Sequence, residues 1–201
     1  FLGGASSVTG TGVGTLTILG ATDATTIGLG GGSGTLQLDD TDLLAFSDEA
    51  VGQFVFGSSS YTGDITLDSV TFRDAVRVEN IAAGVLNVVS TTVGQPGIRG
   101  AQSDATVTLV GADVRLGAGI TTPGALISIT GPVMVSGSVA LDTTNAGAVT
   151  AGANVTVNNL GEPQHQCRQQ HRDPRDNGHR KGCIVLKRGP SARARPRDHG
   201  D

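Results

Sequence analysis

The stretch that decides the fold runs Ala105-Thr-Val-Thr-Leu-Val-Gly-Ala-Asp-Val-Arg-Leu-Gly-Ala-Gly-Ile-Thr-Thr122. Apolar residues alternate with other residues in two short runs, first at Val107 and Leu109 and then at Val114 and Leu116. Alternation with a period of two is typical of β-strands that bury one face. The Gly-Ala-Asp between the two runs is typical of a turn. We therefore predict two short strands joined by a tight corner.

Similar strands recur along the chain, and many of them follow a glycine. A glycine that opens an alternating apolar pair occurs at Gly14, Gly34, Gly63, Gly84, Gly124 and Gly147. The steps between these glycines are 20, 29, 21, 40 and 23 residues, so most steps are near one or two periods of about 20 residues. Two or three short strands per period stack naturally as the coils of a parallel β-helix. This all-β fold is our prediction, and the alternative is a disordered Gly/Ser/Thr-rich segment, which needs no period.

The period also predicts which side chains meet in the core. In successive coils, we expect the inward neighbours to be Ile65, Leu86, Val107 and Ile127, and beside them Leu67, Val88, Leu109 and Ile129. The remaining apolar pairs should form shorter strands within each coil, at Val70/Phe72, Val76/Val78, Val114/Leu116, Val133/Val135 and Val139/Leu141.

Composition excludes several other classes of protein. The chain has 201 residues, of which 31 are Gly, five are Phe, one is Tyr and none is Trp. The glycines have no strict three-residue period, which excludes collagen. Few residues are Lys, Glu or Met, which argues against a helical bundle. Only 37% of the residues are hydrophobic, and no run approaches the roughly 18 apolar residues of a membrane-spanning helix.

The repeats resemble those of filamentous-haemagglutinin-like proteins and autotransporter passengers of bacteria. The resemblance rests on the stretch quoted above and on its continuations, Ala125-Leu-Ile-Ser-Ile-Thr-Gly-Pro-Val133 and Gly137-Ser-Val-Ala-Leu-Asp-Thr-Thr144. It covers roughly residues 14–160 and implies a right-handed parallel β-helix that is secreted or displayed on the bacterial surface. The chain begins at Phe1 without a signal-peptide pattern, so we interpret it as a fragment of a longer protein.

The resemblance implies a structural or adhesive role, and it transfers no functional residue. We accordingly expect no enzymatic activity, no cofactor, no nucleic acid and no insertion of this segment into a membrane. The expected partners are host or cell-surface glycans or proteins. The open strand edges of the terminal coils also make end-to-end association of the fragment an expectation.

The composition changes abruptly near residue 160. Residues 1–160, the predicted β-helix, hold 4 basic and 13 acidic residues, whereas residues 161–201 hold 10 basic and 5 acidic ones. For this tail we predict poor packing and a short strand at Cys183-Ile-Val-Leu-Lys187. Three interpretations are open: a translation in the wrong reading frame, a basic nucleic-acid-binding tail, or a zinc module built from His165, Cys167, His171, His179 and Cys183.

An acidic cluster is the candidate metal site. Asp39, Asp40 and Asp42 lie close together in the sequence, with Asp48 and Glu49 nearby. Calcium prefers several carboxylate or carbonyl oxygens as ligands, and the preceding Gly30-Gly31-Gly32-Ser33-Gly34 faintly resembles a calcium-binding nonapeptide repeat. The alternative is a solvated loop between coils.

A polysaccharide lyase or hydrolase is the alternative function. Enzymes of that kind use paired carboxylates or a basic residue. The charged residues in consecutive short strands that could serve are Asp64, Asp68, Arg73, Asp74, Arg77 and Glu79. In this interpretation Asp68 and Asp74 face outward on neighbouring strands.

Overall fold

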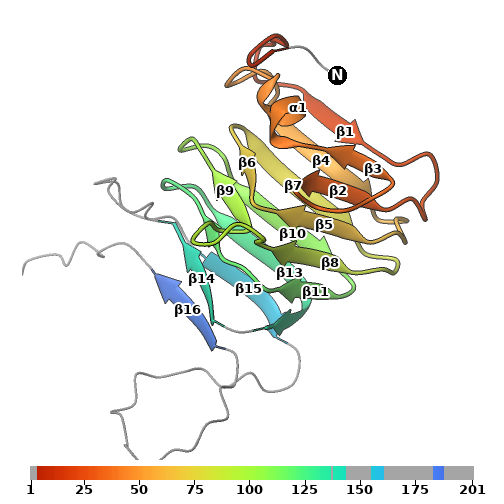
Figure 1. The fold of residues 1–201 in the computed structure, drawn as a ribbon, viewed down its shortest axis with the longest axis vertical. Helices are drawn as coiled ribbons and strands as arrows, with labels where there is room; N and C mark the ends of the chain where they lie inside the picture. The colour runs from red at the N-terminus through yellow and green to blue at the C-terminus, as the bar shows by residue number, and fades with distance from the viewer. Residues whose placement is uncertain (1–3, 137, 144–154, 161–182, 188–201) are drawn as a thin grey trace, which may run out of the picture.

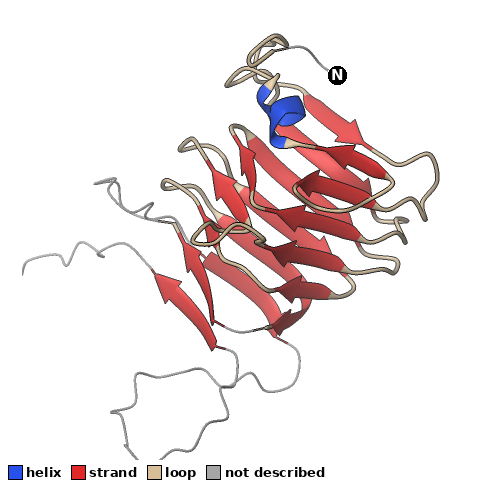
Figure 2. Cartoon of the chain, in the orientation of Figure 1, coloured by secondary structure: helices blue, strands red, loops and turns tan. Residues whose placement is uncertain are grey.

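The fold is mostly β, and every strand pairing in the described residues is parallel. The computed structural model describes residues 4–136, 138–143, 155–160 and 183–187. Its strands form one curled sheet of eleven strands and a second sheet of five. Figure 1 shows the strands stacked along the long axis of the molecule, from β1 near the N-terminus to β16. One helix, α1 (Asp40–Leu44), occurs in the described residues, beside the N-terminal strands (Figure 2).

The pairings arrange the strands in three rows. Row A consists of β1 (Thr15–Ile18), β4 (Gln53–Ser58), β7 (Ala75–Asn80), β10 (Val107–Gly111), the first half of β13 (Ile127–Val135) and β15 (Val155–Leu160). Row B consists of β3 (Leu36–Leu38), β2 (Ile27–Gly30), β5 (Ile65–Asp68), β8 (Leu86–Val89), β11 (Val114–Leu116) and the second half of β13. Row C is the five-stranded sheet and consists of β6 (Val70–Phe72), β9 (Ile98–Gly100), β12 (Ile120–Thr121), β14 (Ser138–Asp142) and β16 (Cys183–Lys187).

The chain passes through the rows in a fixed order. From β4 to β14 it visits rows A, B and C in turn, and we call one such passage a circuit. In the last of these circuits β13 continues from row A into row B as one strand, so that the two rows form a single curled sheet. Gly131 makes this continuation feasible: its φ is +119°, and a Cβ there would lie 1.9 Å from the carbonyl oxygen of Gly111.

The core lies between the rows and is built by alternation. In row A, Phe54 pairs with Val76, Val76 with Val107, and Val107 with Ile127, and these side chains are buried. The residues that alternate with them along each strand, such as Arg77 and Thr108, face outward and are partly exposed. Aromatic rings fill the core near the N-terminal end, through ring contacts among Phe46, Phe54, Phe56 and Phe72. The predicted alternation of strands and the core positions are thus confirmed.

The predicted order of stacking is correct in part. Ile65 pairs with Leu86, and Val107 pairs with Ile127, as expected. The link between Leu86 and Val107 is wrong, because Leu86 pairs with Val114 of row B. Likewise Val88 pairs with Leu116 and not with Leu109. Glycines precede strands in both row A and row B. A period counted from glycine to glycine therefore assigns strands of two different rows to a single stack.

The return distance, which is the number of residues between paired positions in successive circuits, varies more than a single period near 20 would allow. Paired residues are separated by 21 residues from Ile65 to Leu86, by 28 from Leu86 to Val114, and by 31 from Val76 to Val107. The corners therefore differ in length while the strand register stays constant.

The C-terminal part is described only at two strands beyond residue 143. The short strand expected at Cys183–Lys187 is present as β16, and it pairs with β14. The strand expected after Gly147 and the rest of the tail lie outside the described residues. The described residues contain no helix that is long and apolar enough to cross a membrane.

Candidate functional site

An open pocket lies on the outer face of row B. Its volume is about 380 Å³, and its lining is polar apart from one glycine: Thr26, Ser33, Gly34, Thr35, Asp64 and Thr66. Thr35 donates its backbone N–H to the Oγ1 atom of Thr26 over 2.8 Å, which ties the two sides of the pocket together. The pocket therefore offers hydroxyl groups and one carboxylate to a ligand.

The glycine-rich loop before β3 forms the wall of this pocket. A Cβ on Gly34 would lie 2.3 Å from the backbone nitrogen of Gly28, and one on Gly32 would lie 2.2 Å from the carbonyl oxygen of Thr66. The loop lies backbone against backbone on β2 and β5, a contact that only glycine permits. Close packing thus accounts for these glycines, whose sequence faintly resembles a calcium-binding repeat.

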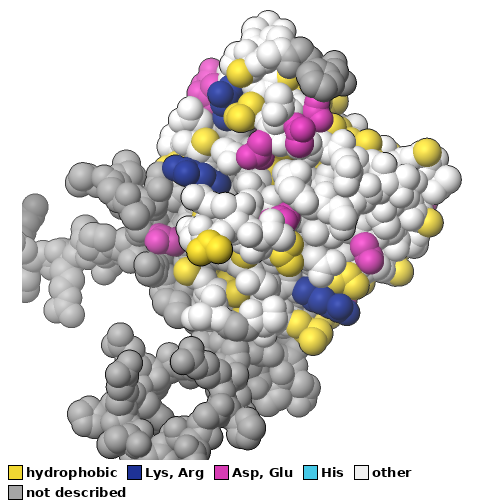
Figure 3. All heavy atoms as spheres, in the orientation of Figure 1, with side chains coloured by type: hydrophobic (Ala, Val, Ile, Leu, Met, Phe, Trp, Pro, Cys, Tyr) yellow, Lys and Arg dark blue, Asp and Glu magenta, His cyan; other side chains and the backbone are white. Residues whose placement is uncertain are grey.

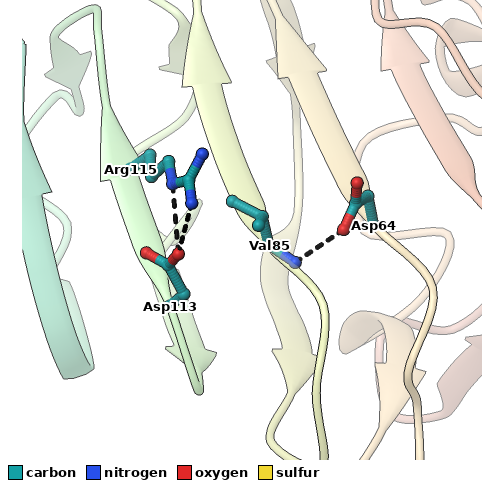
Figure 4. A network of polar contacts seen from close by, with 4 residues as sticks. All are labelled: Asp64, Val85, Asp113 and Arg115. Atoms are coloured by element: carbon teal, nitrogen blue, oxygen red, sulfur yellow. Dashed lines mark hydrogen bonds and ion pairs between the residues drawn. The ribbon is translucent and has the colours of Figure 1, made fainter.

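A polar strip continues from the pocket across β8 to β11. Register places Thr66 beside Asn87, and Asn87 beside Arg115. Figure 4 shows the Oδ1 atom of Asp64 accepting the backbone N–H of Val85, and Arg115 donating to the Oδ2 atom of Asp113. The pKa of the Arg115 guanidinium is raised, chiefly by its hydrogen bonds to Asp113 and next by the charge of Asp113. Desolvation acts to lower this pKa, and the charge of Asp64 adds a last contribution that raises it. The strip can hydrogen-bond a polar ligand.

On the face drawn in Figure 3, charged side chains are scattered singly or in small groups among polar ones.

Asp68 does not face outward, contrary to the expectation for a catalytic carboxylate. Only 3% of the residue is exposed. Its Oδ1 atom accepts from the backbone N–H of Thr91 and from the Ser69 hydroxyl, and its Oδ2 atom accepts from the Thr91 hydroxyl. Burial by itself would raise the pKa of Asp68, but these hydrogen bonds outweigh burial and lower it. The carboxylate fastens the corner between β5 and β6 to the loop that follows β8.

Asp74 is also buried, which corrects the second half of the same expectation. Only 2% of the residue is exposed. Its Oδ1 atom accepts the backbone N–H of Glu49 over 2.8 Å, while its Oδ2 atom is buried and has no hydrogen-bond partner among the described residues. Burial raises the pKa of Asp74, the Glu49 N–H opposes that rise, and the charges of Asp48, Asp104 and Glu49 add to it. This carboxyl group is therefore disfavoured as an anion.

The other charged residues of the enzyme hypothesis lie at separate places. Arg77 forms an ion pair with Glu79 within row A, with 2.8 Å between Nε and Oε2. Arg73 donates from Nη1 to the Ser6 hydroxyl and to the carbonyl oxygen of Phe46. Asp64 lies in the polar strip. The structure thus divides this set between a row, a corner and the strip, and does not gather it into one constellation.

The acidic residues proposed for calcium have structural partners. Asp39 is the N-cap of α1 and accepts the backbone N–H of Asp42 over 2.9 Å. Asp40 accepts the backbone N–H of Thr71 in β6 over 3.0 Å. Burial raises the pKa of Asp40, the Thr71 N–H opposes that rise, and the charge of Asp39 adds to it. Among the described residues, no three His, Cys, Asp or Glu side chains are grouped so that they could hold a metal ion. Calcium binding stays a prediction, and His165, Cys167, His171 and His179 lie outside the described residues.

Comparison with known proteins gives no relative: no family model, no curated protein and no solved structure matches the chain.

Proposed function

We propose that the chain is a right-handed parallel β-helix that serves as a structural or adhesive segment of a large surface or secreted bacterial protein. The observation that carries the proposal is the fixed order of rows A, B and C, with parallel register kept from one circuit to the next. Right-handedness follows from the strong preference of parallel crossover connections for that hand. A fold of this kind gains length by adding circuits, and each added circuit extends its lateral faces.

The polar strip of row B is the surface that we propose for contact with a partner. It carries hydroxyl, amide and guanidinium groups on adjacent strands, at Thr66, Asn87 and Arg115, and a carboxylate directly before β11, at Asp113. These groups suit hydrogen bonding to a hydroxyl-rich glycan or to a polar protein surface. The alternative function, a polysaccharide lyase or hydrolase, loses the two carboxylates on which it chiefly rested, because Asp68 and Asp74 are buried.

Binding and turnover assays on the full chain test this proposal together. We expect the chain to be retained on immobilised cell-surface glycans or matrix proteins, and to release no product from acidic or neutral polysaccharides. Asn87→Ala with Arg115→Ala should weaken retention, whereas Asp23→Asn, a change at an exposed residue outside the strip, should not. Product release that disappears with Asp64→Asn would favour the enzyme instead, and retention that survives the double change would place the contact elsewhere.

A further inference from the structure

The pocket on the outer face of row B contains polar groups that the fold itself does not use. The hydroxyls of Ser33 and Thr66 line the pocket and have no hydrogen-bond partner among the described residues. Asp64 also lines it, and only its Oδ1 atom accepts a hydrogen bond from the described part of the chain, which leaves Oδ2 unpartnered there. Two hydroxyls and one carboxylate oxygen are therefore available to a ligand.

The backbone around the pocket holds these groups in place. Thr66 lies within β5, which pairs with β2 on one side and with β8 on the other. The Oδ1 atom of Asp64 accepts the backbone N–H of Val85 over 2.7 Å, which fixes the carboxylate (Figure 4). Ser33 belongs to the glycine-rich loop that packs backbone against backbone on β2 and β5. Groups that are positioned before a ligand arrives lose less conformational entropy on binding.

The charge of the lining restricts the class of ligand. Asp64 is the one charged residue among those that line the pocket. An anionic ligand would meet this carboxylate without a cation in the lining to compensate it. Calcium prefers several carboxylate or carbonyl ligands, and the lining supplies a single carboxylate. Hydroxyl groups both donate and accept hydrogen bonds, so a neutral ligand with several hydroxyls matches the lining best.

The polar strip beyond the pocket suits an extended chain of such units. Thr66, Asn87 and Arg115 lie side by side on β5, β8 and β11, which follow one another along the stack (Figure 1). Adjacent strands are about 4.8 Å apart, which is close to the length of one pyranose unit in an extended glycan. A glycan with one unit in the pocket can therefore place its next unit over Asn87.

We propose that the pocket binds one neutral hexose unit of a glycan that extends along the row B strip. Hydroxyls of the hexose donate to the Oδ2 atom of Asp64 and accept from the hydroxyls of Ser33 and Thr66. The inference rests on the proposed function and names the ligand class of the same surface. The lining contains no aromatic ring on which a sugar could stack, so a single unit binds weakly and further units along the strip add to the affinity.

An NMR titration of the isotope-labelled full chain is the test. The probes are methyl glycosides of glucose, galactose and mannose, with glucuronate as the anionic sugar and butylammonium chloride as a mimic of a lysine side chain. We expect at least one neutral glycoside to shift the amide resonances of Ser33, Asp64 and Thr66 in a saturable way. Glucuronate and butylammonium should bind at least about tenfold more weakly.

Two variants measure the contributions of the pocket groups. Thr66→Val removes one hydrogen bond and should raise the dissociation constant of the glycoside about threefold to tenfold. Asp64→Asn keeps an acceptor for the Val85 N–H and should raise this constant further, because hydrogen bonds to a charged acceptor are stronger. Thr108→Val, the same exchange at an outward residue of row A, should leave the constant unchanged. Circular dichroism checks that each variant is folded.

Three outcomes would overturn the hexose pocket. The first is that no neutral glycoside shifts the pocket amides, and the second is that folded Thr66→Val and Asp64→Asn both bind like the wild type. The third is that butylammonium binds more tightly than every neutral glycoside, because the pocket would then suit a lysine of a partner protein. In each case, retention on immobilised glycans that falls with Asn87→Ala and Arg115→Ala would leave the proposed function standing, whereas loss of that retention as well would reject both.

Discussion

Two aspartates flank the three-residue strand β6, and their environments are opposite. Asp68 lies before the strand and Asp74 after it, and the two are equally well buried. Asp68 accepts three hydrogen bonds from Thr91 and Ser69, and its pKa is lowered despite burial, which acts to raise it. Asp74 accepts one hydrogen bond and is surrounded by acidic residues, and its pKa is raised by burial first and by those charges second.

Burial alone therefore does not set the effect of a carboxyl group on stability. The sign of this effect depends on how many hydrogen-bond donors replace the water that the carboxyl group loses on burial. The loop after β8 supplies two of the donors at Asp68, whereas the loop before β4 supplies one donor at Asp74. One carboxylate therefore stabilises its corner and the other weakens its own.

The largest expected effect is the difference in stability between the asparagine variants of the two aspartates. Asp68→Asn should lower the free energy of unfolding by about 2–3 kcal/mol at neutral pH, because hydrogen bonds to a charged acceptor are lost. Asp74→Asn should leave that free energy unchanged or raise it, because the change removes a buried charge. Urea denaturation of both variants and the wild type measures the difference.

The same pair of variants should respond to pH in opposite directions. The folded pKa of Asp68 is lowered, so its stabilisation is present above 3.8 and is lost as pH falls through the lowered value. The deficit of Asp68→Asn should therefore shrink in acid. If both variants instead lost equal stability at neutral pH, the contrast between the two corners would be wrong.

A smaller effect is expected from removing a single donor at Asp68. Thr91→Val deletes the hydroxyl that bonds Oδ2 and keeps the backbone N–H that bonds Oδ1. We expect a loss of about 1 kcal/mol in the free energy of unfolding and a rise in the pKa of Asp68, which carboxyl resonances in an NMR titration would report. Thr108→Val, a change at an outward residue of row A that pairs with Arg77 and Ser128, serves as the matched control. An unshifted pKa would mean that the hydroxyl does not contribute to the charge balance.

The smallest effect should come from an exposed ion pair far from both corners. The Nη2 atom of Arg115 lies 2.7 Å from the Oδ2 atom of Asp113, but the arginine side chain is about half exposed. Exposed pairs contribute little, so Arg115→Gln should leave the free energy of unfolding nearly unchanged. Chemical denaturation at low and high salt checks this, and a loss as large as that of Asp68→Asn would show that surface charge matters as much as buried hydrogen bonds.

The strands were predictable from the sequence, whereas their pairing was predictable only in part. Alternation at Val107/Leu109, Val114/Leu116 and Ile65/Leu67 correctly marked strands and core positions. Pairing depends on how many residues each corner takes up, and nothing local in the sequence fixes that number. Leu86 consequently pairs with Val114, which is 28 residues away, although Val107 lies at the expected spacing of 21.

The roles of the two aspartates were missed for different reasons. Alternation from Ile65 and Leu67 puts Asp68 outward, but the chain turns at Ser69, whose φ is +53°, and the loop containing Thr91 covers the corner. For Asp74 a signal was available, since it keeps the same parity as the inward residues Phe72 and Val76. The contact of Asp40 with β6 joins residues 31 positions apart, and the short helix gave no sign of it beforehand.

Constant register combined with variable return distance has a consequence for how this chain can change length. Val114 and Val133 pair after 19 residues, whereas Ile27 and Ile65 pair after 38, with α1 inside the longer stretch. Additional residues are thus accommodated at a corner without displacing the ladders on either side. A peptide inserted at such a corner, for example between Val89 and Ile98, would be displayed on the flank of the stack while the strands above and below kept their partners.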